Sequence, residues 1–395
     1  MAFEHYIQSG GKRLRCGYTT GTCAALAAAG ATRLLLTGAA PESVRLMTPK
    51  GIEVIAPLAE PHCDGQTASV SVIKDAGDDV DVTAGAAIRA TVSRSGAPGV
   101  TIDGGEGVGR VTKPGLDQPV GEAAINRVPR RMIAEQVAAV CDELDYDGGL
   151  RVIISVPGGA ELAKKTFNPQ LGIVGGLSIL GTSGIVEPMS AQALIETIEI
   201  EIRQARAMGA RHLILTPGNY GLDFLREHGL DARGAQVIKC SNFIGDALDA
   251  AAAEGFQSVL LVGHVGKLAK LAGGIMNTHS RYADCRTELF CAHAAICGAG
   301  RETCVELMRA ATTDACIDIL KAAGLDRAVL RSLLDAIHGH LQRRAAGAYA
   351  VGAMLFSNVH GPLGQTQSVE EIIQAWNEIP EHSTESASAP ETPSC

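Results

Sequence analysis

The most constraining feature of this sequence is a repeated unit between residues 151 and 266. In each repeat an apolar, β-branched run is followed by a glycine-containing loop and then by a helical stretch. The apolar runs occupy residues 151–156, 212–216, 237–239 and 258–262. Parallel neighbouring strands need a long connection, usually a helix, so this repeat predicts a parallel sheet with helical crossovers.

The first third of the chain follows a different pattern. Thr19, Thr20 and Thr22 precede an alanine-rich run, which predicts a helix from about residue 20 to just before Gly38. Expected strands cover 44–48, 52–58 and 68–73, and a second helix is expected over 130–144. Strands and helices do not alternate strictly here, which is typical of an α+β domain.

We therefore expect an α/β protein of two domains. The first is an α+β domain over residues 1–147. The second, over residues 148–378, is a Rossmann-like α/β domain whose mainly parallel sheet is followed by a helical region. Residues 381–395 are rich in Ser, Pro, Thr and Glu and are expected to form a disordered tail.

Composition excludes several classes of protein. The net charge is −9 and only 4% of residues are aromatic, whereas a nucleic-acid platform needs basic and stacking side chains. The first residues lack the apolar core of a signal peptide. The long uncharged stretch 166–186 contains Asn168, Pro169 and several glycines, unlike a membrane helix. We expect a cytoplasmic protein without membrane or nucleic-acid partners.

The eleven cysteines are expected to be reduced thiols, most of them in the core. No CxxC pair occurs, and Cys285, Cys291, Cys297 and Cys304 lack the spacing of zinc ligands. We therefore predict no metal site.

Polar and glycine residues follow the expected strands of the repeat. They are Gly158, Gly159, Gly218, Asn219, Asn242, Asp246, Gly263, His264 and Gly266. In an open parallel sheet such loops converge on the crevice outside the carboxyl ends of the strands, where ligands bind. Any one of these loops alone favours an ordinary tight turn, whereas several of them together favour a ligand site.

The segment 171–190 is rich in glycine and hydroxyl residues. It matches neither G-x-G-x-x-G nor the phosphate loop that ends in lysine, which favours a ligand without phosphate, such as an adenosyl group. For Glu187 three roles stay open: a contact with a ribose hydroxyl pair, a position near a cation, and a helix-start carboxylate ahead of Pro188.

Two further clusters are candidates. Residues 261–286 hold His264, Lys267, Lys270, His279 and Arg281, a local basic set that suits an acidic ligand or, alternatively, a solvated helix face. Thr19 to Cys23 stand at a helix start, where hydroxyls suit either an anionic ligand or N-capping. Cys23 is not assigned as a nucleophile.

Six ordered motifs together resemble one family. They are LRCGYTTGTCAA at 14–25, GVGRVTKPG at 107–115, the segment 172–190, TPGNYG at 216–221, KCSNFIG at 239–245 and GHVGKLAKLAGG at 263–274. These motifs resemble the cobalt-precorrin-5B (C1)-methyltransferase family of cobalamin (vitamin B12) biosynthesis. Ala123 and Arg127 depart from the family pattern, where prolines are expected, and this affects only local turn rigidity.

The resemblance implies transfer of a methyl group from S-adenosylmethionine to ring carbon C1 of cobalt-precorrin-5B, giving cobalt-precorrin-6A on the anaerobic route. The corrinoid is then the small-molecule substrate, and cobalt arrives within it. A homo-oligomer and transient contact with neighbouring pathway enzymes are further expectations.

With this reaction in view, loop position and composition select three groups of residues. For the methyl donor we expect Gly175, Gly176, Gly181, Thr182, Ser183 and Gly184, with Asn219 nearby. For the substrate we expect Thr19, Lys239, Asn242, Lys267, His279 and Arg281. For catalysis we expect His264, in polar contact or proton handling, and Thr20. The alternative functions are a nicotinamide-dependent reductase of the same pathway and a noncatalytic corrinoid-binding carrier.

Overall fold

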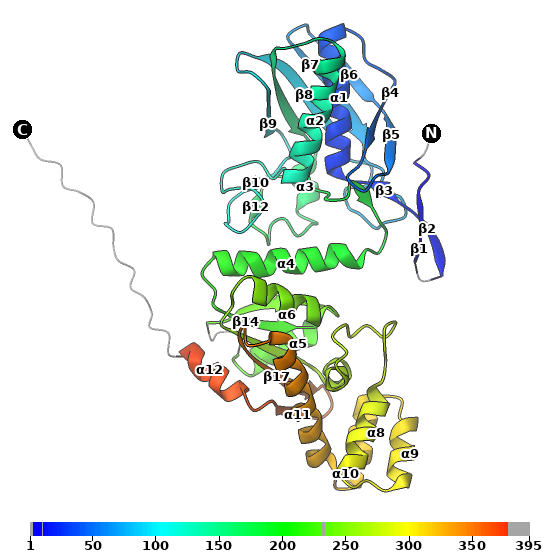
Figure 1. The fold of residues 1–395 in the computed structure, drawn as a ribbon, viewed down its shortest axis with the longest axis vertical. Helices are drawn as coiled ribbons and strands as arrows, with labels where there is room; N and C mark the ends of the chain where they lie inside the picture. The colour runs from blue at the N-terminus through cyan, green and yellow to red at the C-terminus, as the bar shows by residue number, and fades with distance from the viewer. Residues whose placement is uncertain (1–2, 10, 231–233, 378–395) are drawn as a thin grey trace, which may run out of the picture. The chain divides into compact units, whose positions relative to one another are not determined.

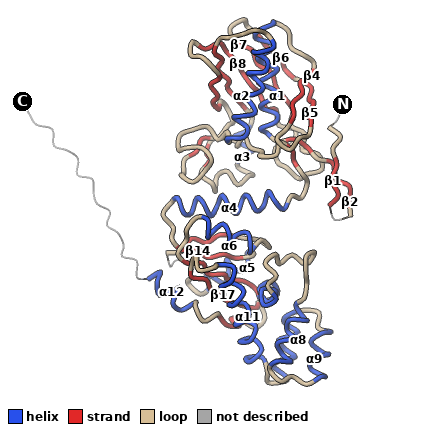
Figure 2. Tube along the Cα trace, in the orientation of Figure 1, coloured by secondary structure: helices blue, strands red, loops and turns tan. Residues whose placement is uncertain are grey.

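The computed structural model describes residues 3–9, 11–230 and 234–377. The chain divides into an N-terminal unit, Met1–Met208, and a C-terminal unit, Gly209–Cys395. Figure 1 shows the course of the chain through each unit, and Figure 2 shows which segments are helix, strand and loop. The expected tail at 381–395 lies outside the described residues.

A five-stranded sheet forms the centre of the N-terminal unit. Its strands, in spatial order, are β6 (Ala59–Cys63), β7 (Thr67–Ile73), β8 (Ala87–Ser95), β11 (Gly149–Ser155) and β9 (Val100–Gly104). Neighbours are antiparallel except β11 and β9, which run parallel. Alternate residues such as Val70 and Val72 are fully buried, so one face of the sheet belongs to the core.

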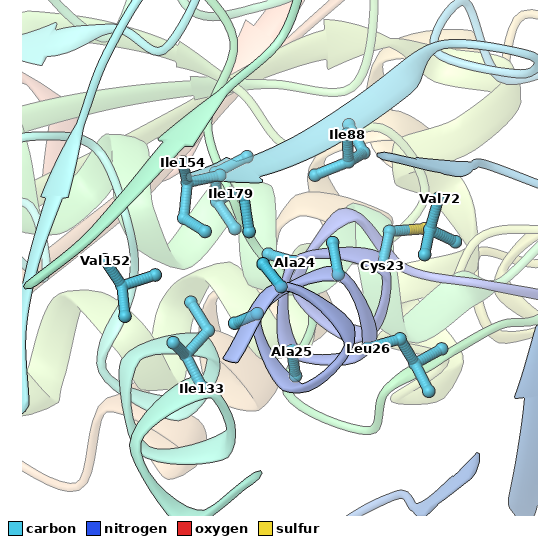
Figure 3. Packing of buried hydrophobic residues seen from close by; sticks show 14 of the residues in the cluster. Cys23, Ala24, Ala25, Leu26, Val72, Ile88, Ile133, Val152, Ile154 and Ile179 are labelled. Carbon is cyan, nitrogen blue, oxygen red and sulfur yellow. The ribbon is translucent and has the colours of Figure 1, made fainter. Parts of the chain in front are cut away.

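Two helices cover that face. Helix α1 (Thr20–Thr37) packs on β7 and β8, and α2 (Arg127–Glu143) lies along α1. Figure 3 shows α1 in this core, with Cys23 and Leu26 among side chains from the sheet and from α2. The small alanine side chains of α1 let the helix approach the sheet closely, which accounts for its burial along most of its length.

The bounds of α1 agree closely with the expected helix because both ends are set locally. Thr19 Oγ1 accepts a hydrogen bond from the backbone N–H of Thr22 at 3.2 Å, which caps the start. Gly38 adopts a left-handed conformation, with φ 79°, and its N–H bonds to the carbonyl of Leu34. The cap role of Thr19, one of its two predicted roles, is therefore confirmed.

Short strand pairs and two further helices complete the unit. The antiparallel pairs are β1 (Tyr6–Ser9) with β2 (Lys12–Arg15), β3 (Gly17–Tyr18) with β13 (Ile185–Val186), β4 (Ser43–Met47) with β5 (Glu53–Pro57), and β10 (Arg110–Val111) with β12 (Ile173–Val174). The helices are α3 (Gly159–Ala163) and α4 (Ala191–Ala207). The β3–β13 pair joins the lead-in of α1 to the glycine-rich segment, which brings two sequence candidates together.

The C-terminal unit is built on a second five-stranded sheet. Its order is β15 (Gln236–Lys239), β14 (His212–Thr216), β16 (Ser258–His264), β17 (Ala350–Ser357) and β18 (Gly361–Gln365). The first four strands are mutually parallel, and β18 is antiparallel to β17. β14 is buried throughout, as expected for a strand covered on both faces.

Helices connect and cover these strands. They are α5 (Asn219–Glu227), α6 (Ile244–Ala253), α7 (Val265–Leu268), the 3₁₀ helix η1 (Ala269–Gly273), α8 (Arg286–Ile296), α9 (Arg301–Arg309), α10 (Thr313–Ala322), α11 (Asp326–Ala345) and α12 (Val369–Asn377). Among the residues that the structure describes, no helix is long and apolar enough to cross a membrane.

The structure differs from the expected organisation in two ways. The chain divides after Met208 rather than at residue 147, because β11 pairs with β8 and β9 of the first sheet. Gly158 and Gly159 therefore belong to the N-terminal unit and not to the parallel sheet. The expected terminal helical region is also followed by more sheet, because β17 and β18 come after α11 in the chain.

Candidate functional site

The N-terminal unit contains a cavity of about 170 Å³ beside the start of α1. It lies between that helix start, the end of β7, the turn that follows it, and the segment 166–186. Its lining residues are Thr19, Thr20, Lys74, Asp81, Thr83, Thr166, Asn168, Leu177, Ser178, Leu180 and Val186. The cavity thus joins two sequence candidates, the helix start and the glycine-rich segment.

Thr20 connects the helix start to the glycine-rich segment by hydrogen bonds. Its Oγ1 accepts a hydrogen bond from the backbone N–H of Leu180 at 2.9 Å. The same hydroxyl lies 3.3 Å from the carbonyl oxygens of Ser178 and Leu180, to which it can donate. Thr20 is buried, so these contacts give it a structural role on the cavity wall, and its catalytic role stays a prediction.

A buried ion pair forms another wall of the cavity. The Lys74 ammonium contacts Asp81 Oδ2, and the Lys74 side chain is only 2% exposed. Thr83 donates to Asp81 Oδ1 from its backbone N–H at 2.8 Å and from its hydroxyl at 2.6 Å. Burial opposes ionisation of Asp81, but Lys74 and the Thr83 donors outweigh it, and the pKa of the carboxyl lies below its usual value.

Sequence reasoning missed Lys74, although a signal was present. Ala68, Val70 and Val72 mark the buried face of β7, and position 74 continues the same alternation. A lysine that continues a buried alternation needs a partner or a ligand, because a charge is costly to bury alone. Asp81 could not be found in this way, since it lies in a turn whose course depends on tertiary contacts.

Asn168 and Ser178 complete the polar part of the lining. Ser178 Oγ donates to Asn168 Oδ1 at 3.2 Å, and Asn168 Nδ2 donates to the Gly176 carbonyl at 3.1 Å. Both side chains are nearly buried. They hold the glycine-rich segment against the preceding turn.

The predicted donor glycines mostly have packing reasons for being glycine. A Cβ at Gly181 would lie 2.2 Å from Thr19 Oγ1, and one at Gly176 would lie 2.2 Å from the Gly107 carbonyl oxygen. A Cβ at Gly184 would lie 2.8 Å from the Thr48 side chain. These close approaches fix the segment against its neighbours, and the donor contacts of these glycines stay predictions.

The remaining donor candidates of this segment are more accessible. Gly175 is exposed, with open space where a Cβ would lie, and Thr182 is exposed. Ser183 Oγ donates to the Ile185 carbonyl at 2.9 Å. Glu187, close behind, pairs with the Lys50 ammonium, which agrees with the predicted position of its carboxylate near a cation.

In the C-terminal unit the loops after β14, β15 and β16 lie at one edge of the sheet. β15 and β16 flank β14 on opposite sides, so the strand order reverses direction at β14. A crevice opens at such a switch point in open α/β sheets. Asn219, Asn242 and His264 stand at this edge, as the repeat predicts, and Lys239 ends β15 there.

His264 stands where β16 meets α7. Its Nδ1 accepts a hydrogen bond from the backbone N–H of Gly266 at 3.0 Å, and its ring meets Phe356 edge-on. Burial lowers the pKa of His264, with a small opposing effect of Asp314, so the neutral imidazole dominates at neutral pH. Because Nδ1 accepts, the neutral ring carries its proton on Nε2 and can donate from there. This arrangement favours polar contact over the base role.

Lys267 bridges two of the strand-end loops. Its Nζ donates to the Pro217 carbonyl at 3.1 Å, linking the turn after β16 to the loop after β14. Burial lowers the pKa of this half-buried ammonium. Lys270, by contrast, is 3% exposed and donates to the carbonyls of Thr278 and Ala283, so it holds the following loop in place.

The other substrate candidates of this unit differ in exposure. Asn242 Oδ1 accepts a hydrogen bond from the Thr278 hydroxyl at 3.2 Å, which organises the loop. His279 Nδ1 accepts from the backbone N–H of Arg281 at 3.1 Å, and both of these side chains are exposed. Lys239 is exposed at the end of β15. The exposed side chains of Lys239, His279 and Arg281 are accessible to a ligand.

The structure therefore separates the predicted site residues into two groups. Thr19, Thr20 and the glycine-rich segment belong to the N-terminal unit. The second group belongs to the C-terminal unit and consists of Asn219, Lys239, Asn242, His264, Lys267, His279 and Arg281.

Two fully buried thiols, those of Cys23 and Cys240, are held in their neutral form by burial. Burial raises the pKa of Cys23 to about 12, and that of Cys240 to about 12. Across residues 3–9, 11–230 and 234–377, no three His, Cys, Asp or Glu side chains gather to hold a metal ion.

Comparison with known proteins finds the same family along most of the chain. The CbiD family matches residues 7–188, and the CbiD C-terminal domain matches residues 277–367. Two relatives carry the name cobalt-precorrin-5B C(1)-methyltransferase. The protein from Ruminiclostridium cellulolyticum is 48% identical over 91% of this chain and 93% of its own. The one from Alkaliphilus metalliredigens is 40% identical over 94% of this chain and 97% of its own.

A crystal structure of the cobalamin biosynthesis protein cbiD from Archaeoglobus fulgidus is 29% identical in sequence. The match covers 70% of this chain and 86% of that one, with a TM-score of 0.39. The family assignment rests on the sequence matches, which run through both units. This chain belongs to the CbiD family.

Proposed function

We propose that this chain transfers a methyl group from S-adenosylmethionine to ring carbon C1 of cobalt-precorrin-5B, giving cobalt-precorrin-6A in anaerobic cobalamin biosynthesis. The observation that carries the proposal is the 48% identity, over 91% of the chain, to a protein named cobalt-precorrin-5B C(1)-methyltransferase. Identity at this level over nearly the full length of both chains favours the same substrate and the same bond formed.

The donor site of the proposal lies in the N-terminal unit, at the cavity and the glycine-rich segment beside it. Supporting it is the mixed character of the cavity wall. Hydroxyl and charged side chains stand on one part, and Leu177, Leu180 and Val186 on another. A donor without phosphate needs no phosphate-loop lysine. The glycine-rich segment has no such lysine, which supports this kind of donor.

The corrinoid carboxylates are assigned to the C-terminal unit. Lys239, His279 and Arg281 are exposed around one sheet edge, and Lys267 stands half-buried at its centre. The chain carries a net charge of −9, so attraction for a polycarboxylate must come from such a local group rather than from the whole protein. Because these cations are exposed, they stay hydrated while no substrate is bound, and the unliganded protein has no cost from burying them.

The chemistry asked of the protein is mainly orientation. S-adenosylmethionine supplies a methyl group on a positively charged sulfur, and the corrinoid carbon displaces that sulfur in line. Holding two reactants in such a geometry is worth up to about 7–11 kcal/mol. His264 contributes a hydrogen-bond donor at Nε2 near the substrate, and no covalent enzyme intermediate is needed.

Calorimetry of donor binding tests the site assignment. We expect the full chain to bind S-adenosylmethionine and S-adenosylhomocysteine but not NADPH. Gly181→Val is expected to abolish donor binding, while Gly255→Val is expected to retain it. Gly255 is a matched control because its φ is also positive, at 70°, with open space around its Cβ position. Binding of NADPH alone would favour a reductase instead.

Variants of the C-terminal unit test the other half. We expect His264→Ala and Lys267→Met to lower turnover and to raise the corrinoid KM, respectively, with donor affinity unchanged. Near-normal turnover in both His264→Ala and Thr20→Ala would overturn the catalytic assignments. Tight corrinoid binding without any methyl transfer would instead identify a carrier.

A further inference from the structure

The buried Lys74–Asp81 pair is the most unusual feature of the cavity in the N-terminal unit. Lys74 is 3% exposed as a whole residue, although lysine is among the side chains least often fully buried. An ammonium has three N–H donors, and the contact with Asp81 uses one of them. Within the described part of the chain, Lys74 Nζ makes no other hydrogen bond. Two donors of a buried charge therefore remain for a ligand.

Stability alone gives no reason for this pair. Removing two charges from water is expensive, and a well-packed apolar pair of similar volume is often equally stable or more so. The pair also stands on the wall of a cavity rather than in a filled core. Costly buried charges at a cavity are typical of binding sites.

Asp81 is held in a fixed orientation with acceptor capacity to spare. Its Oδ1 accepts both Thr83 donors, and its Oδ2 accepts Lys74. A carboxylate offers about four lone-pair sites, so one remains after these three hydrogen bonds. Lys74 and Asp81 thus both line the cavity, and between them they hold two unused N–H donors and one unused acceptor position.

A neighbouring cation and anion together match a zwitterion. A ligand carboxylate can meet Lys74 while a ligand ammonium meets Asp81, and neither charge of the protein is left unpaired. A lone carboxylate would gain from Lys74 but would be repelled by Asp81 at nearly the same distance. The pair therefore discriminates in favour of an α-amino acid group over a simple acid.

The size of the cavity agrees with one end of a larger ligand. Sites for whole drug-sized ligands measure about 300–1,000 Å³, and this cavity measures about 170 Å³. Leu177, Leu180 and Val186 provide an apolar wall for a short methylene chain. We propose that this cavity binds the zwitterionic amino-acid end of S-adenosylmethionine, with Lys74 at the α-carboxylate and Asp81 at the α-ammonium. This inference rests on the proposed function.

Two thioether ligands isolate that end of the donor. S-adenosylhomocysteine carries the amino-acid group, and 5′-methylthioadenosine has the same adenosyl thioether without it. Hydrogen bonds to charged groups contribute more to binding than those between neutral groups. We therefore expect the unchanged protein to bind S-adenosylhomocysteine at least about tenfold more tightly. In Lys74→Met the ratio of the two dissociation constants is expected to fall close to one.

The ratio is insensitive to partial unfolding, because both ligands are measured on the same preparation. Asp81→Asn is a second variant that keeps the shape of the carboxyl group, and it is also expected to lower the ratio. Lys164→Met is the matched control, since Lys164 forms an exposed ion pair with Glu161. It is expected to leave the ratio unchanged.

The outcomes separate this inference from the proposed function. If the unchanged protein binds neither ligand, the proposed donor itself fails. If it binds both equally, or if Lys74→Met keeps the original ratio, the amino-acid assignment is overturned while the methyl-transfer proposal stands. If Lys74→Met keeps the ratio but weakens corrinoid binding, the cavity takes a corrinoid carboxylate and the inference is wrong.

Discussion

The hydroxyl of Thr20 accepts a hydrogen bond from the backbone N–H of Leu180 at 2.9 Å, between residues 160 positions apart in the chain. This contact joins the first turn of α1 to the glycine-rich segment. Both residues line the cavity of the N-terminal unit. The shape of the proposed donor site therefore depends in part on this hydrogen bond, beside those that the N–H of Gly21 and the hydroxyl of Thr22 donate to the same segment.

Thr20→Val should destabilise the protein. Valine has the same shape but no acceptor, so the N–H of Leu180 loses its partner, and such a loss in a buried site costs about 1–3 kcal/mol. Urea unfolding measures the change. Thr197→Val is the control, because the Thr197 hydroxyl lies on a partly exposed helix surface and, among the described residues, donates to the Ala193 carbonyl. Equal stability of the two variants would show that the Thr20 contact contributes nothing.

Gly181→Ala should cost more than Gly175→Ala. Both glycines have positive φ, at 131° and 85°, so alanine is strained at either position. Only at position 181 does the new Cβ also meet a side chain, 2.2 Å from Thr19 Oγ1. Overpacking adds about 1–3 kcal/mol. The free energies of unfolding measure the difference, and equal values would mean that Thr19 moves aside freely.

Much of the fold could be predicted where the signal is local. The start of α1 at Thr19 and its end at Gly38 were readable, since each end depends on one cap within a few residues. The apolar run 151–156 predicts the strand that the structure has as β11, but the repeat assigns this strand to the wrong sheet. An apolar run of this length fits either sheet, and its partners β8 and β9 are chosen by tertiary packing.

The candidate site was predictable to a similar extent. The contact of Thr20 with the glycine-rich segment follows from neither motif alone, although both were selected. Lys74 continues the buried alternation of β7 and was within reach of sequence reasoning. Asp81 was not, because only the folded turn brings its carboxylate to the ammonium of Lys74.

Cys23→Ala should leave methyl transfer close to that of the unchanged protein. The thiol of Cys23 is fully buried, and burial raises its pKa to about 12, so no thiolate is available at neutral pH. Turnover and circular dichroism are compared for the two proteins. Loss of turnover in a variant with an intact fold would show that the thiol takes part in the reaction.

His264→Asn should flatten the pH dependence of stability. Burial lowers the pKa of His264 in the folded state, so below about pH 6.5 the unfolded chain binds a proton that the folded protein does not. Its contribution is therefore full above that pH and is lost as the pH falls through the folded pKa. Asparagine keeps an acceptor for the N–H of Gly266.

Urea unfolding at about pH 7.5 and about pH 5.5 measures this effect. We expect acidification to destabilise the unchanged protein more than His264→Asn. Some slope will remain, since burial also lowers the pKa values of His212 and His293. An identical loss of stability in both proteins would show that His264 titrates as it does in the unfolded chain.

The most direct test of methyl transfer is the mass of the corrinoid product. The full chain is incubated with cobalt-precorrin-5B and S-adenosylmethionine whose methyl group is fully deuterated. We predict a product that has gained one deuterated methyl group at ring carbon C1, formed only when protein and donor are both present. Recovery of unchanged corrinoid, or a label at another carbon, would contradict the proposed function.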